Sequence, residues 1–340
     1  MSKRTFSEVD LHPALLQVTP EIAALGDPHI GRQFKTGVPV HRRGEREAHQ
    51  FEIFKESLNQ FPETTQIHVC MGDLFDAFRM PEEVVLAVAN EYQKAAFARP
   101  QVTYVILSGN HDRSRDSEKK SAFEVLAAIL APVPNIKIVM DEPLVIGKWA
   151  FVPWTPFTDS HEHATKLPDG LDMVFGHWDF IDFGENTHNS VPYQALAGKT
   201  SSIVTGHYHK RGIHLVNNAY GLFDVLVTGS MLPYAHGEDI FNDTYMTLPL
   251  AEVQALLLDN PDRFRNVCLR VLVDENETPI DGIDCLALTH KRVSSGNTKG
   301  IEVKLDEFSL EDVFRKTFKQ NDVSKGTTDR LWKKVEARNI

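Results

Sequence analysis

Five short apolar runs in this chain each end in a glycine followed by side chains that can bind metal ions. The five motifs are "GDPH" (26–29), "GDLFD" (72–76), "GNHD" (109–112), "GHW" (176–178) and "GHYH" (206–209). Glycine allows a sharp turn with no side chain crowding the site. Carboxylate, imidazole and carboxamide groups suit manganese, iron or zinc. Because functional residues gather where strands end, the pattern predicts an α/β fold with a metal site at one sheet edge.

Each motif taken alone has a simpler explanation. "GDPH" is typical of a turn, because Asp-Pro often begins one, and "GDLFD" is typical of a capped loop. His177 alone, beside an apolar strand, is more often a core histidine than a ligand. His207 and His209 are evenly balanced between a turn and a ligand pair, because residues i and i+2 leaving a strand point to the same side. Two metal ions need more ligands than one strand end supplies, so the ordered set of five favours a two-metal centre.

The chain follows the rhythm of an α/β protein. Apolar runs predict buried strands at 21–27, 66–73 and 103–110. Between them, 45–60 and 81–98 have helical apolar spacing, and Pro81 followed by two glutamates favours a helix start. The middle of the chain is richer in strands. A small α+β unit is predicted from about Asp239, and helical segments are predicted from Lys304 onward.

The composition fits a soluble globular protein of the cytoplasm, or of a host's cytoplasm if a phage encodes it. Of the 340 residues, 42% are hydrophobic and 24% charged, and no run is long and apolar enough for a membrane span. The N-terminus lacks the apolar core of a secretory signal. Three unevenly spaced cysteines, Cys70, Cys268 and Cys285, argue against a disulfide framework. The net charge of −11 argues against nonspecific binding of nucleic acid, unless metal ions and clustered basic residues reverse the sign locally.

The ordered set GDxH, GDxxD, GNHD, GH and GHxH resembles the calcineurin-like metallophosphoesterase superfamily, over residues 20 to 240. This resemblance implies a two-metal phosphoester hydrolase on a four-layer α/β/β/α sandwich. The stretches "GDPHIGR…RRGEREAHQFEIF", "VPW" (152–154) and "VTGSMLPYAHGED" (227–239) look like the SbcD family of DNA-repair exonucleases. "GHWDF" and the chain length look most like the recombination nucleases of T-even phages.

The resemblance implies a role for each matching residue. One metal ion would be held by Asp27, His29, Asp73 and His209, and a second by Asp73, Asn110, His177 and His207, with Asp73 bridging. Two divalent ions are expected, manganese first, with magnesium, iron or zinc as alternatives. His111 matches the general acid, and Asp112 is expected to orient the His111 ring. Asp76 is given no catalytic role.

The resemblance also implies domains and partners. The expected divisions are an N-terminal extension (1–20), a nuclease domain (21–240), a capping and DNA-binding domain (241–303) and a helical tail (304–340). The implied partners are DNA, an SMC-like ATPase of the SbcC type docked on the tail, and a second copy of the chain through the helix at 81–98. Ordinary core packing explains the helix equally well, and a core helix or a solvated basic face explains the tail.

The function predicted on this basis is that of a manganese-dependent DNA nuclease in recombination or repair. It would act as an exonuclease on duplex ends and as an endonuclease on single strands or hairpins. One alternative is a metallophosphoesterase for a small phosphodiester or a phosphoprotein, which the acidic charge favours. Another is a non-catalytic binding subunit, which the intact ligand set opposes. His161 and His163 are expected in a solvated loop, and His236 is a candidate to line the site.

Overall fold

The computed structural model of the protein describes residues 11–116, 118–179, 189–239, 244–293 and 332. The chain divides into two compact units, one of residues 1–272 and 279–291 and the other of residues 273–278 and 292–340. All five motifs lie in the first unit. Among the described residues, no helix is long and apolar enough to cross a membrane.

A five-stranded sheet carries the first three motifs. Its order is β1-β2-β3-β4-β5, with β1 at Leu15–Thr19, β2 at Ile22–Leu25, β3 at Ile67–Cys70, β4 at Thr103–Leu107 and β5 at Ile136–Val139. Strands β2 to β5 are parallel, and β1 is antiparallel to β2. Both faces of β2 and β3 are buried, which is why these strands are mostly continuous apolar runs. Motifs 26–29, 72–76 and 109–112 therefore leave the sheet at the same edge.

A six-stranded sheet carries the other two motifs. Its order is β10-β11-β9-β8-β7-β6, with β6 at Leu144–Ile146, β7 at Trp149–Val152, β8 at Met173–Gly176, β9 at Ser202–Thr205, β10 at Gly212–Asn218 and β11 at Gly221–Val227. Strands β7, β8, β9 and β11 are parallel, so 176–178 and 206–209 leave this sheet at a common edge. The edge strands β6 and β10 run antiparallel to their neighbours.

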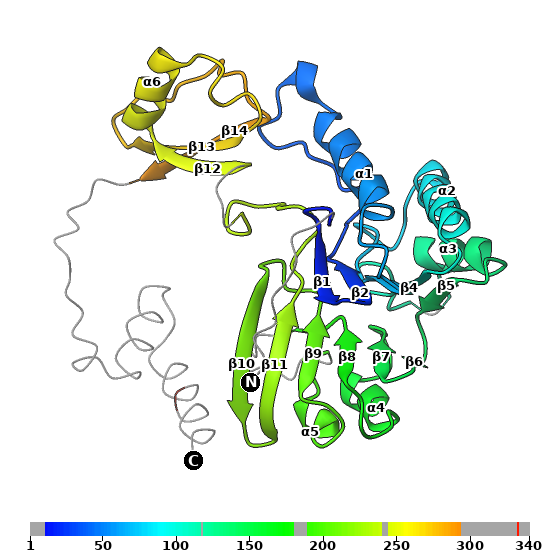
Figure 1. Ribbon diagram of the computed structural model, residues 1–340. Coiled ribbons are helices and arrows are strands. Elements are labelled where there is room, and N and C mark those ends of the chain that lie inside the picture. Colours follow the sequence, from blue (N-terminus) through cyan, green and yellow to red (C-terminus); the bar gives the residue numbers. More distant parts are fainter. Residues whose placement is uncertain (1–10, 117, 180–188, 240–243, 294–331, 333–340) are drawn as a thin grey trace. The chain divides into compact units, whose positions relative to one another are not determined.

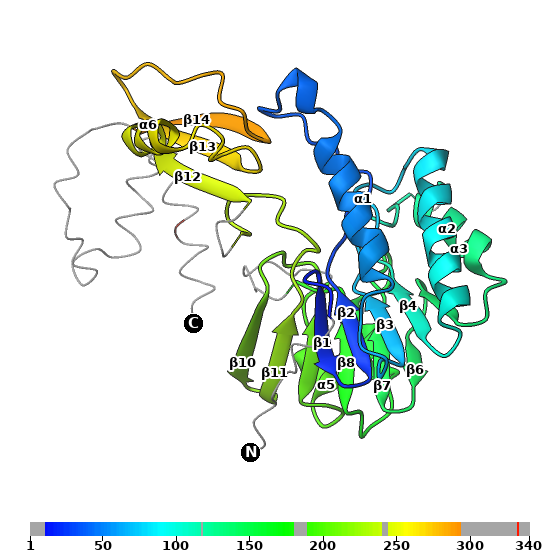
Figure 2. The ribbon, with the colours of Figure 1, turned by 45° about the horizontal axis from the view of Figure 1, so that its top comes forward.

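Three apolar clusters define the layers of the molecule. One packs α1 (Glu45–Ser57), α2 (Glu82–Ala98) and α3 (Ala122–Leu130) on the five-stranded sheet. A second lies between the two sheets. The third packs α4 (Ser160–Thr165) and α5 (Tyr193–Leu196) on the far face of the six-stranded sheet. Figures 1 and 2 show the same order of helices, sheets and helices. The predicted mixed α/β architecture is confirmed.

The edges of the two sheets are joined where the motifs emerge. The backbone N–H of Asp27 donates to the carbonyl of Gly229 (3.1 Å), and the N–H of Met231 donates to the carbonyl of Asp27 (3.0 Å). A Cβ on Gly26 would collide with the Gly229 carbonyl, so only glycine allows this approach. The first motif is thereby fixed against the chain that follows β11.

A small three-stranded sheet follows, with the order β12-β13-β14. Its strands are β12 (Tyr245–Pro249), β13 (Cys268–Asp274) and β14 (Ala287–Val293), and α6 (Leu250–Asp259) lies between β12 and β13 in the chain. Arg42, in the 3-10 turn Val40–Arg42 before α1, is buried and pairs with Glu45 (2.8 Å) and Asp284 (3.3 Å). This side chain ties the start of α1 to the segment before β14.

The structure differs from the sequence predictions at several positions. Strand β1 lies inside the expected N-terminal extension, and its half-polar sequence gave no strand signal. Strand β10 was not anticipated. His163 is buried in α4 with its Nε2 3.1 Å from Thr155 Oγ1, so a solvated loop was wrong there. The domain boundaries stay predictions, and the tail at 304–340 lies outside the described residues except for position 332.

One buried histidine predicts how the fold responds to acid. His68 is enclosed in β3 against the rings of Phe61 and Tyr104. Burial lowers its pKa from 6.5 to about 4. Above pH 6.5, His68 is mostly unprotonated in both the folded and the unfolded chain. As pH falls from 6.5 to about 4, the unfolded chain gains this proton and the folded chain does not. The free energy of unfolding should therefore drop by about 3 kcal/mol over that range from this group alone.

His68→Phe removes this proton while keeping a ring in place. In urea unfolding followed between pH 7 and 4, its stability should fall less than that of the wild type by up to about 3 kcal/mol. Phe61→Leu, which keeps the imidazole, should retain the wild-type pH dependence. Parallel curves for His68→Phe and the wild type would contradict this account.

Candidate metal centre

The predicted ligands converge where the two sheets meet. Three groups have ligand atoms within 4.8 Å of one another: Asp27, His29 and His209; Asp73, His177 and His207; and His29, Asp73 and His111. The first two groups each combine residues from both sheets. His29 and Asp73 each belong to two of the three groups. Residues far apart in the sequence are thus assembled by strand order alone.

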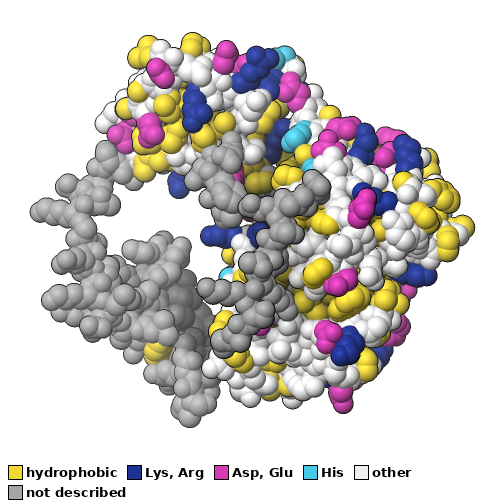
Figure 3. Space-filling view, viewed as in Figure 1, with side chains coloured by type: hydrophobic (Ala, Val, Ile, Leu, Met, Phe, Trp, Pro, Cys, Tyr) yellow, Lys and Arg dark blue, Asp and Glu magenta, His cyan; other side chains and the backbone are white. Residues whose placement is uncertain are grey.

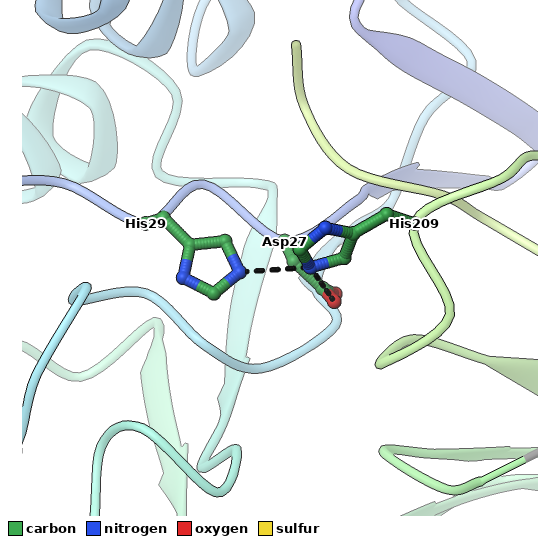
Figure 4. Close-up of side chains that lie close together, drawn as sticks. All are labelled: Asp27, His29 and His209. Carbon is green, nitrogen blue, oxygen red and sulfur yellow. Dashed lines mark hydrogen bonds and ion pairs between the residues drawn. The ribbon is translucent and has the colours of Figure 1, made fainter. Parts of the chain in front are cut away.

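The first group is drawn in Figure 4, where Asp27, His29 and His209 point toward one another. The Nε2 atoms of His29 and His209 lie 3.0 Å apart. His209 Nε2 is 3.8 Å from Asp27 Oδ2, and His29 Nε2 is 3.8 Å from Asp73 Oδ2. Four donor atoms from four motif residues therefore surround one position.

The second group is centred on His177. Its Nε2 lies 3.0 Å from Asn110 Oδ1, 3.2 Å from His207 Nδ1 and 3.4 Å from Asp73 Oδ1. Asp73 turns Oδ1 toward this group and Oδ2 toward His29. One carboxylate thus faces both groups, which is the geometry that a bridging ligand requires.

Hydrogen bonds on the outer nitrogens fix which nitrogen of each ring faces inward. His177 Nδ1 donates to the carbonyl of Met71 (3.0 Å), which leaves Nε2 as a free electron pair toward Asp73. His209 Nδ1 lies 3.1 Å from Glu238 Oε1, and His207 Nε2 lies 2.5 Å from Asp179 Oδ1. Each inward nitrogen then meets another electron-pair donor rather than a proton donor. A cation between these nitrogens and oxygens would bind their lone pairs, so the residues fit two divalent metal ions.

The electrostatics of the two central carboxylates agree with such a fit. Asp27 is fully buried, and its Oδ1 has no hydrogen-bond partner among the described residues. Burial and the charge of Asp73 raise the pKa of Asp27 well above its usual range. Burial also acts to raise the pKa of Asp73, but His177, His29 and His111 outweigh it and lower this pKa. Two buried acids this close need positive charge between them.

The backbone is strained at the same residues. His29 (φ 47°), Asp73 (φ 47°) and His207 (φ 70°) are the only non-glycine residues with positive φ in the described part of the chain. Such conformations cost free energy and persist where the surroundings impose them. The surroundings of Asp73 are tightly packed, because a Cβ on Gly109 would collide with Asp73.

His111 lies at the open side of the centre. Its ring is 42% exposed, and its Nε2 is 4.0 Å from Asp73 Oδ2. Its Nδ1 donates to the backbone carbonyl of Asp76 (2.6 Å), since a carbonyl can only accept. Nε2 is therefore the ring nitrogen that faces the metal centre.

Asp112 has a different position from the one expected. Its carboxylate accepts hydrogen bonds from the backbone N–H groups of Gly109 (2.9 Å), Leu74 (3.1 Å) and Phe75 (2.9 Å). Burial and the charge of Asp73 raise its pKa to about 8. The expectation that Asp112 orients the His111 ring is corrected: the ring is held by the Asp76 carbonyl, and Asp112 holds the second and third motif loops together.

Sequence reasoning missed three carboxylates that position ligands. Asp76, given no role, lies 3.5 Å from His29 Nδ1 and pairs with Arg32 (3.4 Å). Asp179 and Glu238 bond to His207 and His209. The signal for two of them was present, because Asp76 ends "GDLFD" and Asp179 follows "GHW" directly. His236 is in none of the three ligand groups and has Thr247 Oγ1 3.0 Å from its Nδ1.

The fold and the centre together define a metal-dependent phosphoester hydrolase. A family model for calcineurin-like phosphoesterases matches residues 20–243. The chain belongs to this family. A comparison with curated proteins found no match.

Metal content tests the arrangement directly. Wild-type protein dialysed against manganese should retain about two ions per chain by elemental analysis, because the two oxygens of Asp73 face two different sets of ligands. His209→Ala should retain about one, and Asp73→Asn fewer than one, because Asp73 faces both groups. Asp224→Asn, exposed on β11, should match the wild type. Full occupancy in Asp73→Asn would exclude a bridging role for this carboxylate.

Proposed function

We propose that this protein is a two-metal, manganese-dependent DNA nuclease of recombination or repair. The observation that supports phosphodiester hydrolysis is the pair of ligand groups facing Asp73, with the half-exposed His111 beside them. The resemblance of "GDPHIGR…RRGEREAHQFEIF", "VPW" (152–154) and 227–239 to SbcD exonucleases supports DNA as the substrate. The proposed actions are exonucleolytic on duplex ends and endonucleolytic on single strands or hairpins.

A residue of the chain supplies the proton that the leaving group needs. Bound divalent cations would offset the charge of the phosphate and acidify the attacking water. As the water oxygen bonds to phosphorus, the water releases one proton to solvent, and the bond from phosphorus to the departing sugar oxygen breaks. The proton on His111 Nε2 passes to that oxygen, while Nδ1 keeps its hydrogen bond to Asp76. Asp112 accepts a hydrogen bond from the amide of Gly109, and the amide of His111 donates to Asp73 Oδ1. These bonds hold His111 in place beside Asp73.

The acidic charge supports a second candidate, a metallophosphoesterase for a small phosphodiester or a phosphoprotein. Figure 3 shows Lys, Arg, Asp and Glu side chains interspersed over the described part of one face, without an extended basic surface there. A long electrostatic contact with duplex DNA has no support on this face. The two candidates share the metal centre and differ in substrate.

A paired assay separates them and tests His111. With manganese, the wild type should degrade end-labelled duplex DNA, and His111→Gln should lower kcat by about 10²–10⁴-fold. On bis(p-nitrophenyl) phosphate the loss should be smaller, because that leaving group departs without a proton. Intact DNA beside rapid, His111-dependent hydrolysis of the small ester would reject the nuclease proposal. Equal losses on both substrates would reject His111 as the general acid.

We also propose that the chain forms a homodimer through α2 and works with an SMC-like ATPase. Val85, Val88 and Tyr92 of α2 are buried in the core, but Leu86 (57%) and Phe97 (73%) are exposed. Exposed apolar side chains on one helix favour a contact with a second molecule. Light scattering should give twice the chain mass for the wild type and the monomer mass for Phe97→Glu. A monomeric wild type would contradict the dimer. The ATPase contact is proposed for the tail, beyond the described residues.

A further inference from the structure

A cavity of about 260 Å³ adjoins the metal centre, and its lining has an unusual charge. Arg32, Lys35, Arg46 and Arg270 line it, and none of its lining residues is acidic. In a chain with 47 acidic and 36 basic residues, this concentration needs an explanation. Arg32 pairs with Asp76. The other three form no ion pair with any described residue, so their charge is available to a ligand.

Planar groups form a stack along the same cavity. The rings of Tyr234 and Phe34 are stacked at 6.2 Å with an interplanar angle of 27°. The guanidinium of Arg46 lies 3.7 Å over the Phe34 ring and 5.3 Å from the Tyr245 ring, and it also donates to the Tyr245 hydroxyl. Arg46 is therefore held against the Phe34 ring and by the hydroxyl of Tyr245. A cation and π-faces held in this way recognise another flat, polarisable group.

The stack starts at the metal centre. The Tyr234 ring lies 5.4 Å from that of His29 and 6.0 Å from that of His209. Its hydroxyl is bonded to the Pro28 carbonyl, inside the first motif. A ligand with a phosphate at the metals therefore has its next chemical group at the mouth of this cavity.

The positive charges of the cavity affect the pKa of His236, which is one of the lining residues. Burial, followed by the charges of Arg270 and Arg46, lowers the pKa of His236. This histidine stays neutral at neutral pH and adds no charge of its own. The field comes from the arginines and the lysine, and it favours an anion.

We propose that this cavity binds one unpaired nucleotide of the DNA strand next to the phosphate that is cut. The base lies on the stack of Phe34, Arg46 and Tyr245, and the phosphate of that nucleotide is held by Lys35 and Arg270. A phosphate without a base would make no contact with the stacked groups. An uncharged aromatic molecule would form no ion pair with the cationic side chains. A paired base is already stacked in its duplex, which is far too wide for the cavity. The strand must therefore be single or frayed at this point.

The inference rests on the proposed nuclease function, but its test does not depend on cleavage. The full-length chain with manganese is titrated with dAMP and with 2-deoxyribose 5-phosphate, which lacks the base. The wild type should bind dAMP about tenfold more tightly or better, since stacking is worth that much. Arg46→Lys, which keeps the charge and loses the plane, should abolish most of this preference.

Two further variants separate stacking from charge. Arg270→Gln should weaken both ligands by the same factor, because it removes charge and leaves the stack. It also serves if Arg46→Lys proves unstable. Arg99→Lys is the matched control: Arg99 also lies over a ring, that of Phe61 at 4.4 Å, but outside this cavity. It should bind both ligands as the wild type does.

The outcomes distinguish the inference from the proposed function. No preference for dAMP in the wild type, or an unchanged preference in Arg46→Lys, overturns the nucleotide cavity even if DNA is cleaved. An Arg46-dependent preference in a protein that leaves DNA intact keeps the cavity and replaces DNA by a small nucleotide ester. If both hold, an abasic residue placed next to the cut site should raise the KM for DNA about tenfold or more.

Discussion

The structure of this centre depends on one carboxylate, that of Asp73. Its two oxygens face different histidine groups, and its backbone is held at a positive φ to achieve this. Three imidazoles keep it ionised despite nearly complete burial. An acid in this position repels Asp27 and attracts cations, so the surrounding donors are useful only when metal ions lie between them.

The rest of the fold can be understood as support for that carboxylate. Two sheets with parallel central strands meet at the edge where those strands end, which brings five motifs together. Gly109 leaves room for Asp73, and the amide of His111 donates to Asp73 Oδ1 at 2.8 Å. Asp112 in turn fixes the loops on both sides. Strain at His29 and His207 is tolerated because other contacts hold these residues: the amide of His29 donates to the Asp73 carbonyl (2.9 Å), and the amide of His207 donates to Asp27 Oδ2 (2.8 Å).

Much of this could be predicted because the signals are local. An apolar run, a glycine and a polar ligand stand next to one another in the sequence, so the strands and the side chains at their ends were found together. Asn110 and His177 illustrate this: they are 67 positions apart in the chain, but Asn110 Oδ1 and His177 Nε2 lie 3.0 Å apart where the strands end. The prediction failed where partners come from elsewhere. Nothing near Asp112 in the sequence shows that its carboxylate binds the amides of Leu74 and Phe75.

Two edge strands were missed for a related reason. Strand β1 has a mixed sequence and becomes a strand by pairing with β2, and β10 is stabilised by its pairing with β11. Tertiary context outweighs local propensity at such positions. The cationic cavity was equally hidden, because Phe34, Arg46 and Tyr245 belong to three separate segments.

The most direct test of the two-metal account is a crystal structure of manganese-soaked protein with anomalous data at the manganese edge. The account predicts two anomalous peaks, one beside Asp27, His29 and His209 and the other beside Asn110, His177 and His207. Asp73 should contact both. A single peak, or two peaks that do not share Asp73, would contradict it.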